Sequence, residues 1–248
     1  MHPILESIDG VDATRPVAIF RFNRTEGPAY FADWLDASGI GWDLVPLDQR
    51  SAVPRDPRSY AGIAMMGGPM SANDPLPWIE PVLALLREAV AAKVPVLGHC
   101  LGGQLLAKAM GAPVTRANAT EIGWVDVAVP ASEGARDWFG GRAQFPTFQW
   151  HYEAFELPAG ATRVLENRYN PNQAYVIDDR HIGLQCHVEM TDALVENWLT
   201  TGASELPQAS TPAVQSAADI RRELPARVAA LHAVADDIYA RWAKGLVR

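Results

Sequence analysis

The chain has few cysteines and no long apolar run. Cys100 and Cys186 are its two cysteines, and neither a Cys-x-x-Cys pair nor a His-Glu-x-x-His stretch occurs. The sequence therefore lacks the usual spacing of metal ligands, and we expect no metal site. Two cysteines would pair in a secreted protein, whereas in a reducing cytoplasm they remain thiols. No apolar run is long enough to span a bilayer, so we expect no membrane protein.

Basic residues are also scarce. The chain has 21 Lys and Arg against 29 Asp and Glu, a formal net charge of −8. This balance argues against a surface for nucleic acid or for an anionic membrane. Residues 1–12 contain three acids and no Lys or Arg, unlike the basic start of a signal peptide. We therefore expect a cytoplasmic protein that binds neither nucleic acid nor membranes.

The remaining composition is typical of a folded globular protein. Hydrophobic residues make up 48% of the chain and charged residues 20%. A chain of 248 residues can bury one substantial core, so we predict a single domain over 1–248.

Strands and helices alternate in the first half of the sequence. After an irregular leader at 1–15, we expect strands at 17–22, 42–47, 60–66 and 94–97. Helices are expected at 29–38, 77–93 and 104–110, after the first, third and fourth of these strands. This alternation predicts a parallel α/β sheet, whose ligands bind beyond the carboxyl ends of the strands. The second half is punctuated by Gly and Pro, and predicts shorter elements. They are strands at 125–129, 144–150, 164–167, 174–178 and 182–185, helices at 191–200 and 220–246, and a loop at 202–215.

A nucleophile elbow is the central motif of the sequence. The stretch Gly98-His99-Cys100-Leu101-Gly102 lies between an apolar strand and a helix, with glycines on both sides of Cys100. Such a turn exposes the side chain, and the helix start lowers the pKa of the thiol. A buried structural cysteine is the alternative, and it would be favoured for a cysteine without this context.

A cysteine nucleophile needs a base and a group that orients the base. Among the six histidines, His187 follows a predicted strand, and Glu189 lies on the same side of an extended chain. His151 is the second candidate for the base. His99 adjoins Cys100 and is expected to point elsewhere, while His2 and His232 lie in the leader and in the last helix.

These motifs resemble those of class I, triad-type glutamine amidotransferases. Residues 98–104 resemble the family's Gly-x-Cys-x-Gly-x-Gln elbow, and His187-Val188-Glu189 resembles its His-Pro-Glu segment with valine in place of proline. Residues 67–69 resemble its Gly-Gly-Pro turn. The likeness covers about 17–200, and Glu-Gly-Pro at 26–28 with Glu-Ile-Gly-Trp at 121–124 is similar to stand-alone members. It implies a flavodoxin-like three-layer sandwich with a mostly parallel mixed sheet, followed by a C-terminal helical extension at about 216–246.

The resemblance also implies roles for single residues. Cys100, His187 and Glu189 would form the catalytic triad, and the backbone N–H groups of Gly68 and Leu101 would form the oxyanion hole. The implied glutamine-binding residues are Met70, Gln104, Trp150 and Tyr152. Many relatives have glycine at the position of Tyr152, so the pocket is expected to be narrower or differently gated. No metal or organic cofactor is implied.

Three functions follow as hypotheses. The first is a glutamine amidotransferase that releases ammonia and glutamate from L-glutamine through a Cys100 thioester and passes ammonia to a synthase chain. The second is a hydrolase of larger γ-glutamyl compounds, such as γ-glutamyl peptides. The third is a non-catalytic redox or stress protein with a cysteine elbow. The 48 residues after Thr200 are too few for an ATP-binding synthetase domain.

Overall fold

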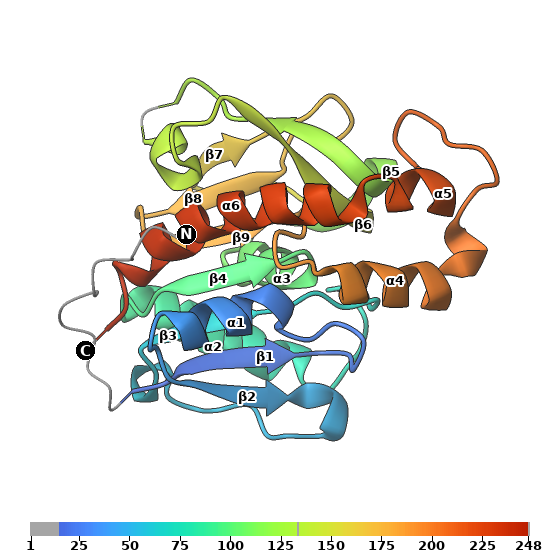
Figure 1. Cartoon of the computed structure of the whole chain (residues 1–248). Coiled ribbons are helices and arrows are strands. Elements are labelled where there is room, and N and C mark those ends of the chain that lie inside the picture. The colour runs from blue at the N-terminus through green and yellow to red at the C-terminus, as the bar shows by residue number, and fades with distance from the viewer. Residues whose placement is uncertain (1–14, 133, 248) are drawn as a thin grey trace.

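The computed structural model describes residues 15–132 and 134–247. Nearly all of the leader predicted at 1–15 lies outside these residues, as does His2. A seven-stranded sheet forms the centre of the molecule, in the order β2-β1-β3-β4-β9-β8-β7 (Figure 1). Five neighbouring strands are parallel: β2 (Trp42–Pro46), β1 (Val17–Arg21), β3 (Gly62–Met65), β4 (Val96–His99) and β9 (His181–Leu184). The antiparallel strands β8 (Ala174–Ile177) and β7 (Thr162–Leu165) complete one edge.

Helices cover both faces of this sheet because its strands are apolar on both sides. Along β1, Val17 and Ile19 pack in one core cluster with α1 (Ala29–Ala37) and α6 (Leu224–Ala243). Ala18 and Phe20 point the other way, into a cluster with α2 (Ile79–Ala91) and α3 (Leu101–Ala109). The result is the three-layer, flavodoxin-like α/β sandwich with a mixed sheet that the sequence predicted.

A separate antiparallel ribbon crosses one end of the sandwich. It consists of β5 (Val114–Ala128) and β6 (Gln144–Phe155), with a register shift between Arg116 and Glu121. The sequence predicted only 125–129 and 144–150 because the first half of β5 is polar and does not alternate. That half is a strand because β6 supplies hydrogen-bond partners for its backbone.

The C-terminal segment forms two helices rather than the single helix predicted at 220–246. The helix α5 (Ala217–Arg221) ends just before Glu223, whose φ is +57°, and α6 begins with Leu224-Pro225. Proline is tolerated in the first turn of a helix but not within one, which explains the break. The apolar stripe of α6 packs in the core, as predicted. Before it lies α4 (Asp192–Thr201), followed by the 3₁₀ turn η4 (Ala203–Glu205).

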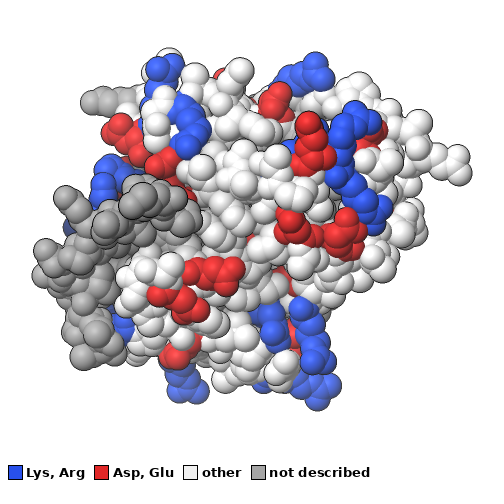
Figure 2. Space-filling view, viewed as in Figure 1, with Lys and Arg blue, Asp and Glu red and all other residues white. Residues whose placement is uncertain are grey.

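The structure bears on two expectations drawn from the composition, the absence of a membrane span and the absence of a basic surface. None of the helices in the described part of the chain combines the length and apolar character needed to cross a bilayer. On the face drawn in Figure 2, Lys and Arg are scattered among acidic and uncharged residues and do not gather in one patch.

Candidate active site

The elbow is a strained turn between β4 and α3. Cys100 has a φ of 48° and a ψ of −107°, a backbone conformation that residues with a side chain rarely adopt. It places the thiol at the carboxyl end of β4, and α3 begins at the next residue. Glycine is required at Gly98, because a Cβ there would lie 2.5 Å from the backbone of Gly102 and Gly103.

The helix α3 begins three residues earlier than predicted. The sequence placed its start at Gln104, since Gly102 and Gly103 disfavour a helix. Both glycines instead lie inside α3, where the helix packs directly on the sheet. A Cβ on Gly103 would lie 2.5 Å from the carbonyl oxygen of Leu184. The small size of Gly102 lets α3 approach Met65 of β3, and that of Gly103 lets it approach β9. β9 leads into the segment that contains His187.

Cys100 lines a cavity of about 600 Å³. The sequence predicted an exposed side chain, but the residue is only 6% exposed, and it lines this cavity. Its backbone N–H donates to the Leu184 carbonyl oxygen at 2.8 Å. The side-chain nitrogen of Gln185 lies 3.6 Å from Sγ. Sequence reasoning missed Gln185, although its position two residues before His187 places it on the same side of an extended chain.

His187 and Glu189 form a buried pair next to this thiol. Nδ1 of His187 lies 2.7 Å from Oε1 of Glu189, and the backbone N–H of His187 is fixed by the Phe148 carbonyl oxygen of β6. Burial by itself would lower the pKa of His187, but the charges of Glu189 and Cys100 and its hydrogen bonds with both outweigh burial and raise it well above its usual value. Burial would likewise raise the pKa of Glu189, yet nearby His99 and His187 lower it to about 2. The pair therefore favours an ionised carboxylate beside a basic imidazole.

Two further side chains lie behind Glu189. Nε2 of His99 is 3.2 Å from the hydroxyl of Tyr239 on α6 and 3.7 Å from Oε2 of Glu189. His99 thus points away from Cys100, as predicted, but its contact with Glu189 was not foreseen. Burial, the largest effect, lowers the pKa of His99. Tyr239 belongs to a helix that sequence reasoning assigned to core packing alone.

The two expected oxyanion donors lie side by side. Gly68 lines the cavity, and a Cβ placed on it would lie 2.8 Å from the Leu101 side chain. The backbone N–H of Leu101 is the first of α3, and the first N–H groups of a helix have no partner within it. Leu101 directly follows Cys100 at the start of α3, and Gly68 lines the cavity from the loop after β3.

The four expected substrate-binding residues, Met70, Gln104, Trp150 and Tyr152, all line the cavity. The amide nitrogen of Gln104 is already bonded to the Glu153 carbonyl oxygen and to Gln185, at 3.0 and 3.3 Å. The Trp150 indole and the Tyr152 hydroxyl both donate to Oε2 of Glu205 in η4. Tyr152 is 39% exposed, and the expected change in gating remains a prediction.

Comparison with known proteins decides the family. The sequence model described as glutamine amidotransferase class-I matches residues 32–197. The chain belongs to the class I glutamine amidotransferase family. It superposes on a crystal structure of a glutamine amidotransferase from Methylobacillus flagellatus with a TM-score of 0.92 and 46% identity, over 94% of this chain and 96% of that one.

Relatives within this amidotransferase family differ in length and in named activity. A glutamine amidotransferase-like protein of Salmonella typhimurium, YfeJ, is 27% identical over 79% of this chain and 85% of its own length. γ-Glutamyl peptidase 3 of Arabidopsis thaliana is 25% identical, over 64% of this chain and 67% of its own. A glutamine-hydrolysing GMP synthase of Aeropyrum pernix is 30% identical over 65% of this chain. The chain spans only 31% of that synthase, so what the synthase does as a whole does not transfer.

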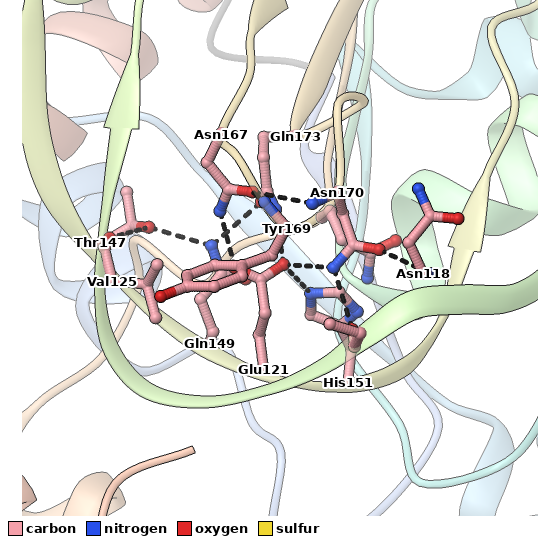
Figure 3. Close-up of polar contacts among 12 residues, drawn as sticks. Asn118, Glu121, Val125, Thr147, Gln149, His151, Asn167, Tyr169, Asn170 and Gln173 are labelled. Atoms are coloured by element: carbon pink, nitrogen blue, oxygen red, sulfur yellow. Dashed lines mark hydrogen bonds and ion pairs between the residues drawn. The ribbon is translucent and has the colours of Figure 1, made fainter. Parts of the chain in front are cut away.

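This amidotransferase chain has a second histidine–carboxylate pair at the cavity. His151 lines the cavity, and its Nε2 lies 3.2 Å from Oε2 of the fully buried Glu121. Figure 3 shows Glu121 surrounded by amide side chains of 167–173. They donate to its two oxygens at 2.5 to 2.7 Å, from Asn167, Asn170 and Gln173. Burial would raise the pKa of Glu121, but the nearby His151 and hydrogen bonds from the asparagines lower it.

Three features lie outside the site described so far: the second cysteine, the histidine of the last helix, and the side chains that could bind a metal. Cys186 is fully buried in the core, on the other side of the chain from His187, and burial raises the pKa of its thiol. His232 stacks on Tyr30, and its Nε2 lies 2.8 Å from the Met190 carbonyl oxygen. Within residues 15–132 and 134–247, no group of three or more His, Cys, Asp or Glu side chains is arranged to hold a metal ion.

Proposed function

We propose that this protein hydrolyses the side-chain amide of L-glutamine, with Cys100 as nucleophile and His187 with Glu189 as the base pair. One observation carries the proposal: a strained cysteine elbow faces a cavity next to a histidine held 2.7 Å from a buried carboxylate. This arrangement favours transfer of the thiol proton to the imidazole, which produces a reactive thiolate.

In the first half of the reaction, Cys100 Sγ attacks the amide carbon and forms a C–S bond. The negative charge moves to the former carbonyl oxygen, where the N–H groups of Gly68 and Leu101 would stabilise it. His187 donates its Nε2 proton to the leaving nitrogen, the C–N bond breaks, and ammonia departs. A γ-glutamyl thioester remains on Cys100.

In the second half, water attacks the thioester carbon. His187 takes a proton from the water, the C–S bond breaks, and the proton returns to the thiolate as glutamate leaves. Glu189 stays ionised throughout and holds the imidazole in one orientation. Met70, Gln104, Trp150 and Tyr152 would position the glutamyl group.

A second candidate function is hydrolysis of larger γ-glutamyl compounds. The cavity of about 600 Å³ falls within the range of about 300–1,000 Å³ that holds drug-sized ligands, so a γ-glutamyl dipeptide would fit. Similarity to a γ-glutamyl peptidase points the same way. A purely redox or stress role is less favoured, because it gives no use to the His187–Glu189 pair.

Ammonia from glutamine would pass to a synthase chain, as a family that includes GMP synthases suggests. We further propose that the chain acts as one domain, since α6 and the sheet share one apolar cluster. A cytoplasmic location remains a prediction from composition.

The test is to incubate the purified protein with L-glutamine and, separately, with γ-glutamyl dipeptides, and to measure ammonia, released amino acid and glutamate. We expect turnover of glutamine and labelling of the Cys100 peptide by diazo-oxo-norleucine. Turnover of peptides with none of glutamine would favour the second candidate. Labelling of Cys186 alone, with no turnover, would contradict both.

A further inference from the structure

Glu26 lies at the cavity but has no part in the reaction described so far. Its carboxyl lines the cavity that also contains Cys100. The position over Gly67 places it next to His187: a Cβ on Gly67 would lie 2.5 Å from Oε2 of Glu26 and 2.9 Å from Cε1 of His187. Gly67 is therefore needed to let the carboxyl and the imidazole approach the same point.

The loop that contains Glu26 is fixed to the site at both ends. The backbone N–H of Glu26 donates to the Asn23 carbonyl oxygen at 3.1 Å, and the indole of Trp198 donates to the Thr25 carbonyl oxygen at 2.9 Å. Trp198 also packs edge-on against His187, with ring centroids 4.7 Å apart. Beyond the loop, the Tyr30 backbone N–H donates to the carbonyl oxygen of Glu189. These contacts hold the backbone of this loop beside His187 and Glu189.

The orientation of His187 indicates what Glu26 would contact. Nδ1 of His187 is taken by Glu189, so Nε2 must exchange the proton with the leaving nitrogen. Cε1 is bonded to both ring nitrogens, so a group against Cε1 is close to whatever binds Nε2. The leaving nitrogen of an amide carries N–H groups and becomes ammonia or an amine, for which a carboxylate is the complementary acceptor.

We propose that Glu26 is the residue that recognises the leaving nitrogen of the γ-glutamyl amide, accepting its N–H as a carboxylate beside His187. The inference rests on the proposed amide hydrolysis and assigns it a leaving-group site. Glu26 forms and breaks no covalent bond. It favours substrates whose leaving nitrogen has an N–H, and it stabilises the positive charge that His187 and the departing amine share in the transition state.

The charges around Glu26 fit this role. Burial raises the pKa of Glu26 to about 7, and the charge of Glu189 adds to that rise, whereas His187 opposes it. The other ionisable groups that line the same cavity are Cys100, Arg116, His151, Tyr152, Glu153 and Glu205. Near neutral pH the carboxyl is thus partly protonated when the cavity is empty, and a leaving amine beside it would favour the ionised form.

The test compares Glu26→Gln with the wild-type protein in glutamine hydrolysis across pH. The uncharged amide introduced at position 26 accepts a hydrogen bond from the leaving nitrogen more weakly than a carboxylate does. We therefore expect kcat/KM to fall about 10- to 100-fold above pH 7. Well below pH 7 the two proteins should approach each other, because Glu26 is then protonated in both the free and the working enzyme. Asp33→Asn is the matched control, because it removes one exposed charge on α1 and should leave the profile unchanged.

A second readout does not depend on substrate turnover. Alkylation of Cys100 by iodoacetamide should show an inflection near the pKa of Glu26 that Glu26→Gln lacks.

Thermal stability gives a third readout. A carboxyl with a raised pKa stabilises the fold fully below its unfolded pKa and loses that contribution as pH rises through its folded pKa. Glu26→Gln should therefore have a higher Tm than the wild type above pH 7, which loss of a structural residue would not give.

The outcomes separate this inference from the proposed function. Unchanged glutamine kinetics and an unchanged alkylation profile in Glu26→Gln would overturn the leaving-group role and leave the proposed hydrolysis intact. A wild-type protein that releases no ammonia or amine from any γ-glutamyl amide would overturn the hydrolysis and the leaving-group role together. A loss of alkylation rate at all pH values in Glu26→Gln would contradict the inference as well, since it would place Glu26 in thiol activation.

Discussion

Two histidine–carboxylate pairs lie near the cavity that contains Cys100, and they are built differently. Glu189 has one short contact, to His187 at 2.7 Å, and its Oε2 has no hydrogen-bond partner among the described residues; His99 lies 3.7 Å from it. Glu121 instead accepts from three amide side chains in addition to its contact with His151 at 3.2 Å. Both carboxylates are buried and both have a lowered pKa.

The number of hydrogen-bond donors around each carboxylate determines whether it holds the fold together or acts on its histidine. The amides around Glu121 satisfy its charge and join β5 to the segment 167–173, so the residue anchors the ribbon. Glu189 has few donors, so its charge acts mainly on His187 and raises the pKa of that histidine. Sparse hydrogen bonding around a buried carboxylate thus leaves its field available to a neighbouring base.

The largest expected effect comes from removing the nucleophile that either pair could serve. Cys100→Ala should reduce glutamine hydrolysis to the background rate, because neither histidine can form the thioester. The fold should persist, since the substitution removes one buried atom at the edge of the cavity. Ammonia release and circular dichroism measure both. Near-wild-type turnover in a well-folded variant would exclude Cys100 as the nucleophile.

The second expected effect is at the His187–Glu189 pair, whose carboxylate has few hydrogen-bond donors. Glu189→Gln should lower kcat by up to about four orders of magnitude, because the amide cannot stabilise the imidazolium. Thiol chemistry tolerates this loss better than serine chemistry, since a thiolate is more easily formed. Steady-state kinetics and Tm are the measurements. A fully active Glu189→Gln variant would show that His187 needs no charged partner.

The third prediction applies a Glu→Gln substitution to the His151–Glu121 pair, whose carboxylate accepts from three amide side chains. Glu121→Gln places an amide nitrogen among amide donors and leaves them unpaired, which should destabilise the fold by about 1–3 kcal/mol. Turnover should change less than in Glu189→Gln, because Glu121 acts on the ribbon and on His151. Urea unfolding and glutamine kinetics test this. A larger loss of turnover than in Glu189→Gln would reverse the two assignments.

The smallest expected effect is at the sulfur next to His187. Cys186→Ala removes a fully buried side chain from the core and should cost about 1 kcal/mol of stability. Turnover should stay within about twofold, because Cys186 points away from the cavity. Tm and kcat together check the prediction. An inactive Cys186→Ala variant would mean that the side-chain alternation assumed around His187 is wrong.

Local patterns in the sequence predicted much of the fold. The alternation of apolar strands and helices up to residue 112 predicted β1 to β4 and their parallel direction, because period-2 and period-3.6 burial are properties of each segment. Their order in the sheet was not predicted. The first half of β5 was missed because its polar side chains show no period. Its pairing depends on the far end of β6, where Val114 lies opposite Phe155 and Arg116 opposite Glu153.

The candidate site divides in the same way. The sequence by itself determined the elbow, since glycines around Cys100 permit a strained strand-to-helix turn, and it determined that His187 and Glu189 share one side of the chain. Only the tertiary structure decided which distant groups meet them: Gln185 at the thiol, His99 and Tyr239 behind Glu189, and Glu26 beside His187. The physical reason is range. Backbone geometry relates residues a few positions apart, whereas these contacts arise where β1, β4, β9 and α6 pack into one core.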